Sequence, residues 1–192
     1  MAKKASKAKA AGAGGKIPGA PSREVLLARG RTPMRAGRRS RAKAGQYNLE
    51  LEIVNRSGVP VPQAFLRSWV QAMAREAALV IDPKQYADRE LVIAFVTTDE
   101  IRDLNKRYRG KNKPTDVLSF ESEDPSCVGE LAIAPEVVAK QAREHGLLVR
   151  EEMGYMILHG FLHLLGYDHE TSPRDATRMF KLQDELFERL LA

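Results

Sequence analysis

Hydrophobic and polar residues follow regular patterns from about residue 47 onward, and these patterns predict most of the secondary structure. Residues 48–55 alternate apolar and polar side chains, as in a strand with one buried face. Further strands are predicted at residues 90–96, 116–120 and 128–134. The spacing of apolar residues predicts five helices, at about residues 62–81, 97–109, 135–145, 150–165 and 172–190.

Residues that commonly begin or end helices support this assignment. Thr97 and Glu100 form a capping box, Ser172 with Pro173 begins the last helix, and Gly166 ends the one before it. The helix at 150–165 is apolar around most of its circumference, so we expect it to be central and buried. The order of elements predicts an α+β fold, a small mixed four-stranded sheet packed with about five helices. The pattern leaves the order of the strands open.

Charge divides the chain into two parts. Residues 1–45 contain 13 Lys or Arg and a single acidic residue, a net charge of +12, whereas the remainder carries −6. A segment so poor in large apolar residues predicts a disordered basic tail, residues 1–45, ahead of a single domain at 46–192. The tail either adds salt-dependent affinity for phosphate backbones or only solubilises the protein. A later translation start, for instance at Met34, and an organelle transit peptide are further alternatives.

Cysteine content and hydropathy narrow the class of protein. Cys127 is the only cysteine, which excludes an intramolecular disulfide and a cysteine-based zinc finger and favours a reducing cytoplasm. Apolar runs such as residues 91–96 are far shorter than the roughly 18 residues that span a bilayer. We therefore expect a soluble cytoplasmic protein without a membrane partner. Any metal site must use histidines or carboxylates.

Three of the four histidines lie within residues 159–169. His159 and His163 are four residues apart on the predicted helix, so their imidazoles share one face and can bind one metal ion. Gly166 lets the chain turn back and bring His169 to the same place as a third ligand. Three neutral imidazoles favour Zn²⁺, one per chain, and leave a fourth position open for water, as in catalytic sites. Asp168 either orients a ligand imidazole or serves only the turn.

The histidine spacing is also that of the metzincin proteases, so a metalloprotease is an alternative. Those enzymes place a glutamate directly after the first histidine as the general base. Here that position is Gly160, which has no side chain to accept a proton.

A basic loop provides a second group of candidate residues. Residues 104–120 contain five Lys or Arg around one tyrosine, at a junction of helix and strand. Arg109, Lys111 and Lys113 can hold phosphates, and Tyr108 can stack on an unpaired base or pack against the protein. The alternative is a solvated helix end whose cations offset the helix dipole. Together with a zinc site, the loop indicates phosphodiester cleavage.

These motifs closely resemble those of the YbeY family of bacterial rRNA maturation endoribonucleases. The resemblance rests on the string from Asn105 to Phe120, on residues 129–133 and on the string from His159 to His169, and it covers about residues 47–190. It implies a zinc-dependent, single-strand-specific endoribonuclease of small-subunit rRNA 3′-end maturation and ribosome quality control. It also implies His159, His163 and His169 as zinc ligands and Arg109 as an arginine needed for activity.

The implied partners are ribosomal RNA, the small ribosomal subunit and its assembly factors, and no DNA is expected. Glu121 stands where family members commonly have proline, Glu130 stands where they have aspartate, and the basic tail has no family counterpart. Glu130 is a further candidate that we expect to approach the site from its strand. A non-enzymatic RNA-binding assembly factor with a structural zinc is the remaining alternative.

Overall fold

The computed structural model describes residues 47–192 and, before them, only the backbone of Lys16–Ile17. The predicted tail, residues 1–45, therefore lies outside the described residues apart from these two.

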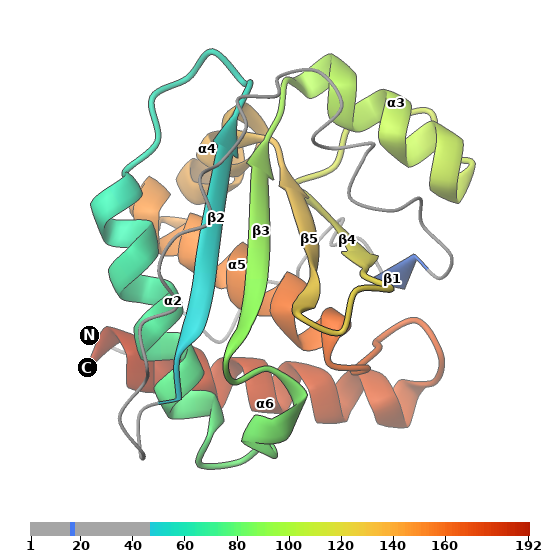
Figure 1. The fold of residues 1–192 in the computed structure, drawn as a ribbon. Coiled ribbons are helices and arrows are strands. Elements are labelled where there is room, and N and C mark those ends of the chain that lie inside the picture. The colour runs from blue at the N-terminus through green and yellow to red at the C-terminus, as the bar shows by residue number, and fades with distance from the viewer. Residues whose placement is uncertain (1–15, 18–46) are drawn as a thin grey trace.

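Figure 1 shows the helices and strands of the described residues. The strands are β1 (Lys16–Ile17), β2 (Leu49–Asn55), β3 (Arg89–Phe95), β4 (Val117–Glu121) and β5 (Cys127–Ile133). The helices are α2 (Gln63–Ala77), α3 (Thr98–Arg109), α4 (Pro135–His145), α5 (Val149–Leu164), α6 (Pro173–Leu191) and the short 3-10 helix η2 (Pro83–Gln85). The four predicted strands and five predicted helices are confirmed, and β1 adds a short fifth strand. The largest difference is at α2, which ends at Ala77 because residues 78–80 form a turn.

The sheet is mixed, and its strand order differs from the order in the sequence. The strands lie in the order β1-β4-β5-β3-β2. β2, β3 and β5 run parallel to one another, β4 is antiparallel to β5, and β1 is parallel to β4. β5 therefore lies between β4 and β3, and the hairpin of β4 and β5 places both strands beside the helix that carries the histidines.

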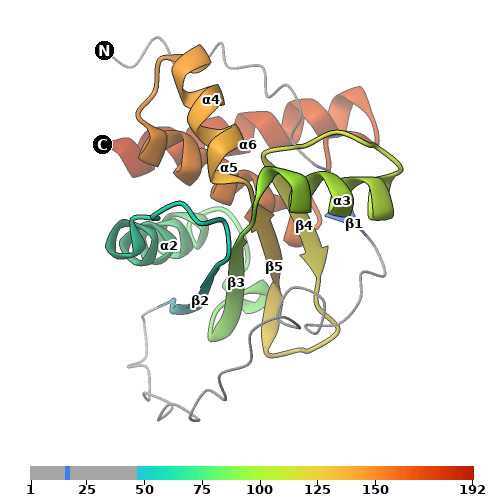
Figure 2. The same cartoon turned by 90° about the horizontal axis from the view of Figure 1, so that it is seen from above.

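Alternating residues of the strands supply two separate cores. Leu91, Ile93 and Leu131 belong to the larger core, which includes buried residues of α2, α5 and α6. Ala94 and Ala132 belong to the smaller core, which they share with apolar residues of α3. The sheet thus separates α3 from the other helices, and Figure 2 shows α5 and α6 together behind it.

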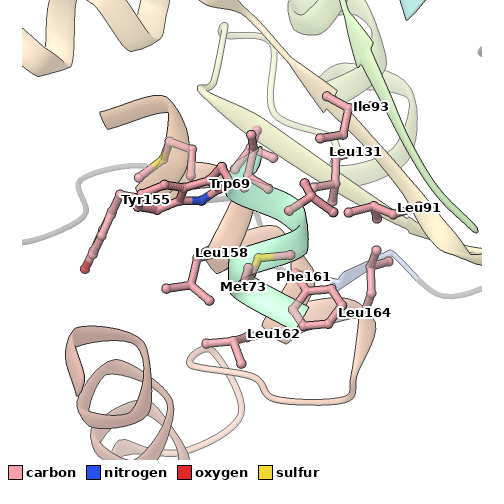
Figure 3. Packing of buried hydrophobic residues seen from close by; sticks show 14 of the residues in the cluster. Trp69, Met73, Leu91, Ile93, Leu131, Tyr155, Leu158, Phe161, Leu162 and Leu164 are labelled. Carbon is pink, nitrogen blue, oxygen red and sulfur yellow. The ribbon is translucent and has the colours of Figure 1, made fainter. Parts of the chain in front are cut away.

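Helix α5 is buried from Glu152 to Leu164. Its side chains fill the space between α2 and the sheet, where Figure 3 shows Leu158, Phe161 and Leu162 around Met73 of α2. Each such side chain contributes about 1.5–3 kcal/mol to folding by leaving water. The element that positions the histidines is therefore fixed by the main core of the protein.

Candidate metal centre

Helix α5 carries two of the three clustered histidines on one face. His159 and His163 are fully buried, and their ring centroids lie 4.6 Å apart. Their Nε2 atoms are 3.1 Å apart, so both nitrogens are directed to the same point. The helical spacing of four residues produces this arrangement, as the sequence predicts.

The turn after α5 brings in the third histidine. Gly166 has φ +89°, and its N–H donates to His163 O while the N–H of Tyr167 donates to Leu162 O. Glycine takes this left-handed conformation without the steric cost of a Cβ, so the chain can reverse here. The ring centroid of His169 consequently lies 5.1 Å from that of His159 and 5.0 Å from that of His163.

Asp168 stabilises the turn rather than a ligand imidazole. Its Oδ1 accepts the N–H of Glu170 at 2.8 Å, and its Oδ2 accepts the hydroxyl of Thr171 at 2.9 Å. Of the two alternatives for this carboxylate, the contacts favour the structural one.

A buried glutamine of α6 fixes the orientation of His159. Gln183 is fully buried, and its Oε1 lies 2.8 Å from Nδ1 of His159. An amide oxygen can only accept, so Nδ1 carries the proton and Nε2 keeps its lone pair toward His163. Phe180, also on α6, packs its ring against His159 and His169, with centroids 6.3 and 5.2 Å away. One turn of α6 thus supplies both a polar and an apolar support.

Burial keeps the three imidazoles neutral at neutral pH. Loss of hydration, with a smaller contribution from the neighbouring His159, lowers the pKa of His163 to about 3. Burial is also the main cause of the lowered pKa values of His159 and His169. Neutral imidazoles are the form that binds metal ions.

The three residues fit a metal ion. One ligand nitrogen from each can be chosen so that all lie within 4.8 Å of one another. In a tetrahedral zinc site with bonds of about 2.05 Å, ligand nitrogens are about 3.3 Å apart, close to the 3.1 Å between His159 and His163. Within the part of the chain that the structure describes, no other group of three or more His, Cys, Asp or Glu side chains has this geometry. The fourth histidine, His145, pairs instead with Glu152, 3.0 Å away.

The basic loop lies next to this cluster. Arg109 is the last residue of α3, and Gly110, with φ +69°, caps the helix and redirects the chain. Nη2 of Arg109 donates to both carboxylate oxygens of Glu170, the residue after His169, and Nζ of Lys111 is 3.8 Å from the same carboxylate. The charges of Arg109 and Lys111 contribute to the lowered pKa of His169. Two predicted phosphate-binding cations therefore lie beside the candidate ligands.

The other residues of the loop are placed differently. The side chain of Lys113 is exposed, while its carbonyl oxygen accepts the amide of the buried Asn105 at 2.8 Å. Tyr108 packs edge-on against Phe120, with centroids 5.4 Å apart. The ring of Tyr108 is thus part of the smaller core, which favours the packing alternative over stacking on a base.

The structure places Glu130 on the face of the sheet that carries α3, opposite the face that α5 covers. Leu131, the next residue of β5, pairs with Ser119, whose hydroxyl contacts the carbonyl of Gly160 on α5. Glu130 pairs with Phe120, which belongs to the core on the α3 side. Since successive side chains of a strand point to opposite faces, Glu130 lies on the face away from the histidines.

Gly160 shows why this helix lacks the glutamate of the metzincins. A Cβ at this position would lie 2.7 Å from Cδ2 of Leu131 and 3.1 Å from Oγ of Ser119. The position faces the sheet at close range, so a glutamate here would displace the side chains of Leu131 and Ser119. This packing argues against the protease alternative.

Sequence reasoning did not identify Gln183 and Glu170. Gln183 lies on the apolar stripe of α6, between the buried Met179 and Leu186. A polar residue within an apolar stripe is a usable signal for a buried hydrogen bond. Glu170 has no comparable signal, because its partner Arg109 is 61 residues away.

Comparisons with known proteins agree on one family. The family model described as endoribonuclease YbeY matches residues 52–191. Endoribonuclease YbeY of Bdellovibrio bacteriovorus is 48% identical over 145 residues, which cover 74% of this chain and 96% of that protein. Endoribonuclease YbeY of Persephonella marina is 39% identical over 131 residues, 65% of this chain and 86% of that protein.

A solved structure shares the fold. The solution structure of a Thermotoga maritima protein superposes with a TM-score of 0.52 at 27% identity, covering 74% of this chain and 89% of that one. Among the described residues, no helix is long and apolar enough to cross a membrane.

Proposed function

The chain belongs to the YbeY family, and on this basis we propose that it is a zinc-dependent endoribonuclease that cuts single-stranded RNA in rRNA processing. One observation supports the proposal most directly: three neutral, converging imidazoles lie beside Arg109, so a metal ligand set and a phosphate-binding group meet at one place. The proposed partners are ribosomal RNA and the small ribosomal subunit with its assembly factors. The proposed compartment is the cytoplasm, where ribosomes are assembled.

His159, His163 and His169 would hold one Zn²⁺ ion in this proposal. When bound, zinc supplies Lewis-acid chemistry at neutral pH, since it activates water and polarises phosphoryl oxygens. Gln183 keeps the ligand nitrogen of His159 unprotonated, and Phe180 shields one side of the cluster from water. The closely packed helix holds two of the ligands in place, so His159 and His163 need little reorganisation when the ion enters.

Arg109 would bind the phosphate to be cut and stabilise the negative charge that develops on its oxygens. Lys111 and Lys113 would hold neighbouring phosphates of the strand, as point charges on long side chains. We assign Tyr108 to the support of this loop, because its ring already packs against Phe120. Selectivity for single strands is an expectation from the family resemblance.

Cleavage of labelled RNA tests the proposal. The zinc-loaded full chain is incubated with an rRNA fragment bearing an unprocessed single-stranded 3′ end, beside His169→Ala, Arg109→Ala and a control, Arg102→Ala. Arg102 lies on the same helix and pairs with Asp99 and Asp103 instead of the site. We expect discrete fragments from the parent and the control, none from His169→Ala, and turnover about 10²-fold lower for Arg109→Ala.

Other outcomes would favour the alternatives. RNA binding without cleavage by any sample, with loss of fold in His169→Ala, would favour an assembly factor with a structural zinc. Hydrolysis of a generic peptide substrate would favour a metalloprotease. Equal cleavage by Arg109→Ala and Arg102→Ala would contradict the role proposed for Arg109.

A further inference from the structure

A carboxylate of the chain itself lies where the two proposed phosphate-binding cations meet. Nη2 of Arg109 is 2.6 and 2.5 Å from the two oxygens of Glu170, and Nζ of Lys111 is 3.8 Å from one of them. We name this place, defined by Arg109 and Lys111, the anion seat. A carboxylate and a phosphate present similar pairs of charged acceptor oxygens to an arginine, so Glu170 occupies the position that a phosphate needs.

The two side chains of this ion pair differ in their exposure to solvent. The side chain of Arg109 is 12% exposed, whereas that of Glu170 is 44% exposed. The backbone at Glu170 is held by Asp168, which accepts its N–H and also binds Thr171. Rotation of the Glu170 side chain alone would therefore clear the anion seat without moving His169 or the rest of the turn.

We propose that Glu170 is a positioning residue that stands in for the substrate phosphate, and that RNA binds by exchanging its phosphate for this carboxylate. The inference rests on the proposed endoribonuclease function for the identity of the anion. In the absence of RNA, Glu170 keeps the guanidinium of Arg109 directed at the histidine cluster. When RNA binds, the carboxylate turns to solvent and its ion pair is replaced by one with the phosphate. Glu170 therefore lowers the affinity for every anion that uses the anion seat.

Two substitutions separate ion-pair exchange from a general effect of charge. Glu170→Gln removes the charge, and Glu170→Asp keeps the charge but shortens the side chain by one methylene, so that it no longer reaches Arg109. Glu144→Gln is the control, because Glu144 is an exposed carboxylate on α4 that pairs with Lys140 at 3.9 Å. Two quantities are measured on the zinc-loaded full chain: the KM for single-stranded RNA, and the Kd for sulfate from NMR shifts of residues 109–113 and 168–172.

If a phosphate replaces the Glu170 carboxylate on Arg109, Glu170→Gln and Glu170→Asp should both lower the KM for RNA and the Kd for sulfate by about 2- to 5-fold. A change in affinity of this size is expected for the loss of one exposed ion pair. Glu144→Gln should match the parent. If only Glu170→Gln tightens binding, the effect is one of charge and the exchange is refuted. Unchanged or weaker binding in both variants would equally refute it.

The sulfate titration keeps this inference distinct from the proposed function. Tighter sulfate binding by both Glu170 variants, with no RNA cleavage by any protein, would support the anion seat and contradict the endoribonuclease. Cleavage by the parent, with KM and sulfate Kd unchanged in the Glu170 variants, would support the endoribonuclease and contradict the role of Glu170.

Discussion

Replacing Gln183 by leucine tests whether α6 prepares His159 to bind a metal ion. The side chain is fully buried, and its Oε1 accepts the Nδ1 proton of His159 at 2.8 Å. Leucine has a similar volume, so the change removes the acceptor without opening a large cavity. Nδ1–H is then left buried without a partner, at a cost of about 1–3 kcal/mol, or the proton moves to Nε2 and blocks the ligand atom.

Loss of a hydrogen bond of this kind to a metal-binding histidine typically weakens metal affinity 10- to 100-fold, or about 1.4–2.7 kcal/mol. We expect a loss in this range for Gln183→Leu, measured by competition for zinc with a chromophoric chelator. Gln183→Glu is the matched control, because it keeps an acceptor for His159 while it loses the same amide donor, which lies 3.5 Å from the carbonyl of Tyr155. The control should bind zinc at least as tightly as the parent.

Two results would refute this reasoning. Equal zinc affinity for Gln183→Leu and the parent would show that the hydrogen bond does not prepare His159. Equal losses in the leucine and glutamate variants would show that the amide donor matters and the acceptor does not. Circular dichroism of each variant establishes that the comparison is made on folded protein.

The remaining predictions concern the metal ligands, pH and packing. His163→Ala should reduce the zinc content of the purified protein well below that of the parent by elemental analysis, and unchanged content would disprove the ligand assignment. Because folding lowers the pKa of His163 from 6.5 to about 3, the unfolded chain binds more protons between these values. The free energy of unfolding of the metal-free protein should therefore fall as the pH is lowered from about 6.5 toward 3; denaturant titrations showing a rise would contradict this. Gly129→Ala should destabilise the fold by about 2–5 kcal/mol, because the residue has φ +150° and its Cβ would lie 2.7 Å from Phe120 O. Gly58→Ala, with φ +75° and nothing within 4 Å, should cost only about 1 kcal/mol in the same thermal unfolding assay.

Local patterns in the sequence were sufficient to predict the helices and strands and the clustering of the three histidines. The spacing of His159 and His163 fixes their shared face through helix geometry alone, and Gly166 marks the turn that returns His169. The strand order was not predictable in this way, because the pairing of β3 with β5 joins segments separated by α3 and β4. The face of the sheet on which Glu130 lies was not predictable for a related reason. Which face of β5 meets α5 depends on its register with β4, and that register is set by tertiary packing.

The contacts of Gln183 and Glu170 could not be read from local spacing either. The hydrogen bond between Gln183 and His159 joins two helices and spans 24 residues, and the ion pair between Glu170 and Arg109 spans 61. Both depend on how the helices and the turn after α5 pack against one another. The periodicity of a single element carries no information about that packing.

The division of the three ligands between a core helix and a surface turn has a consequence for metal loss. His159 and His163 are held by the main core whether or not an ion is present, whereas His169 is held by a short turn that depends on Asp168 and its neighbours. Removal of zinc with a chelator should therefore speed amide hydrogen exchange in residues 166–172 while α5 keeps its slow exchange. Part of the free energy of metal binding would then offset the cost of ordering this turn. Release of the ion would open the site locally and leave the domain folded.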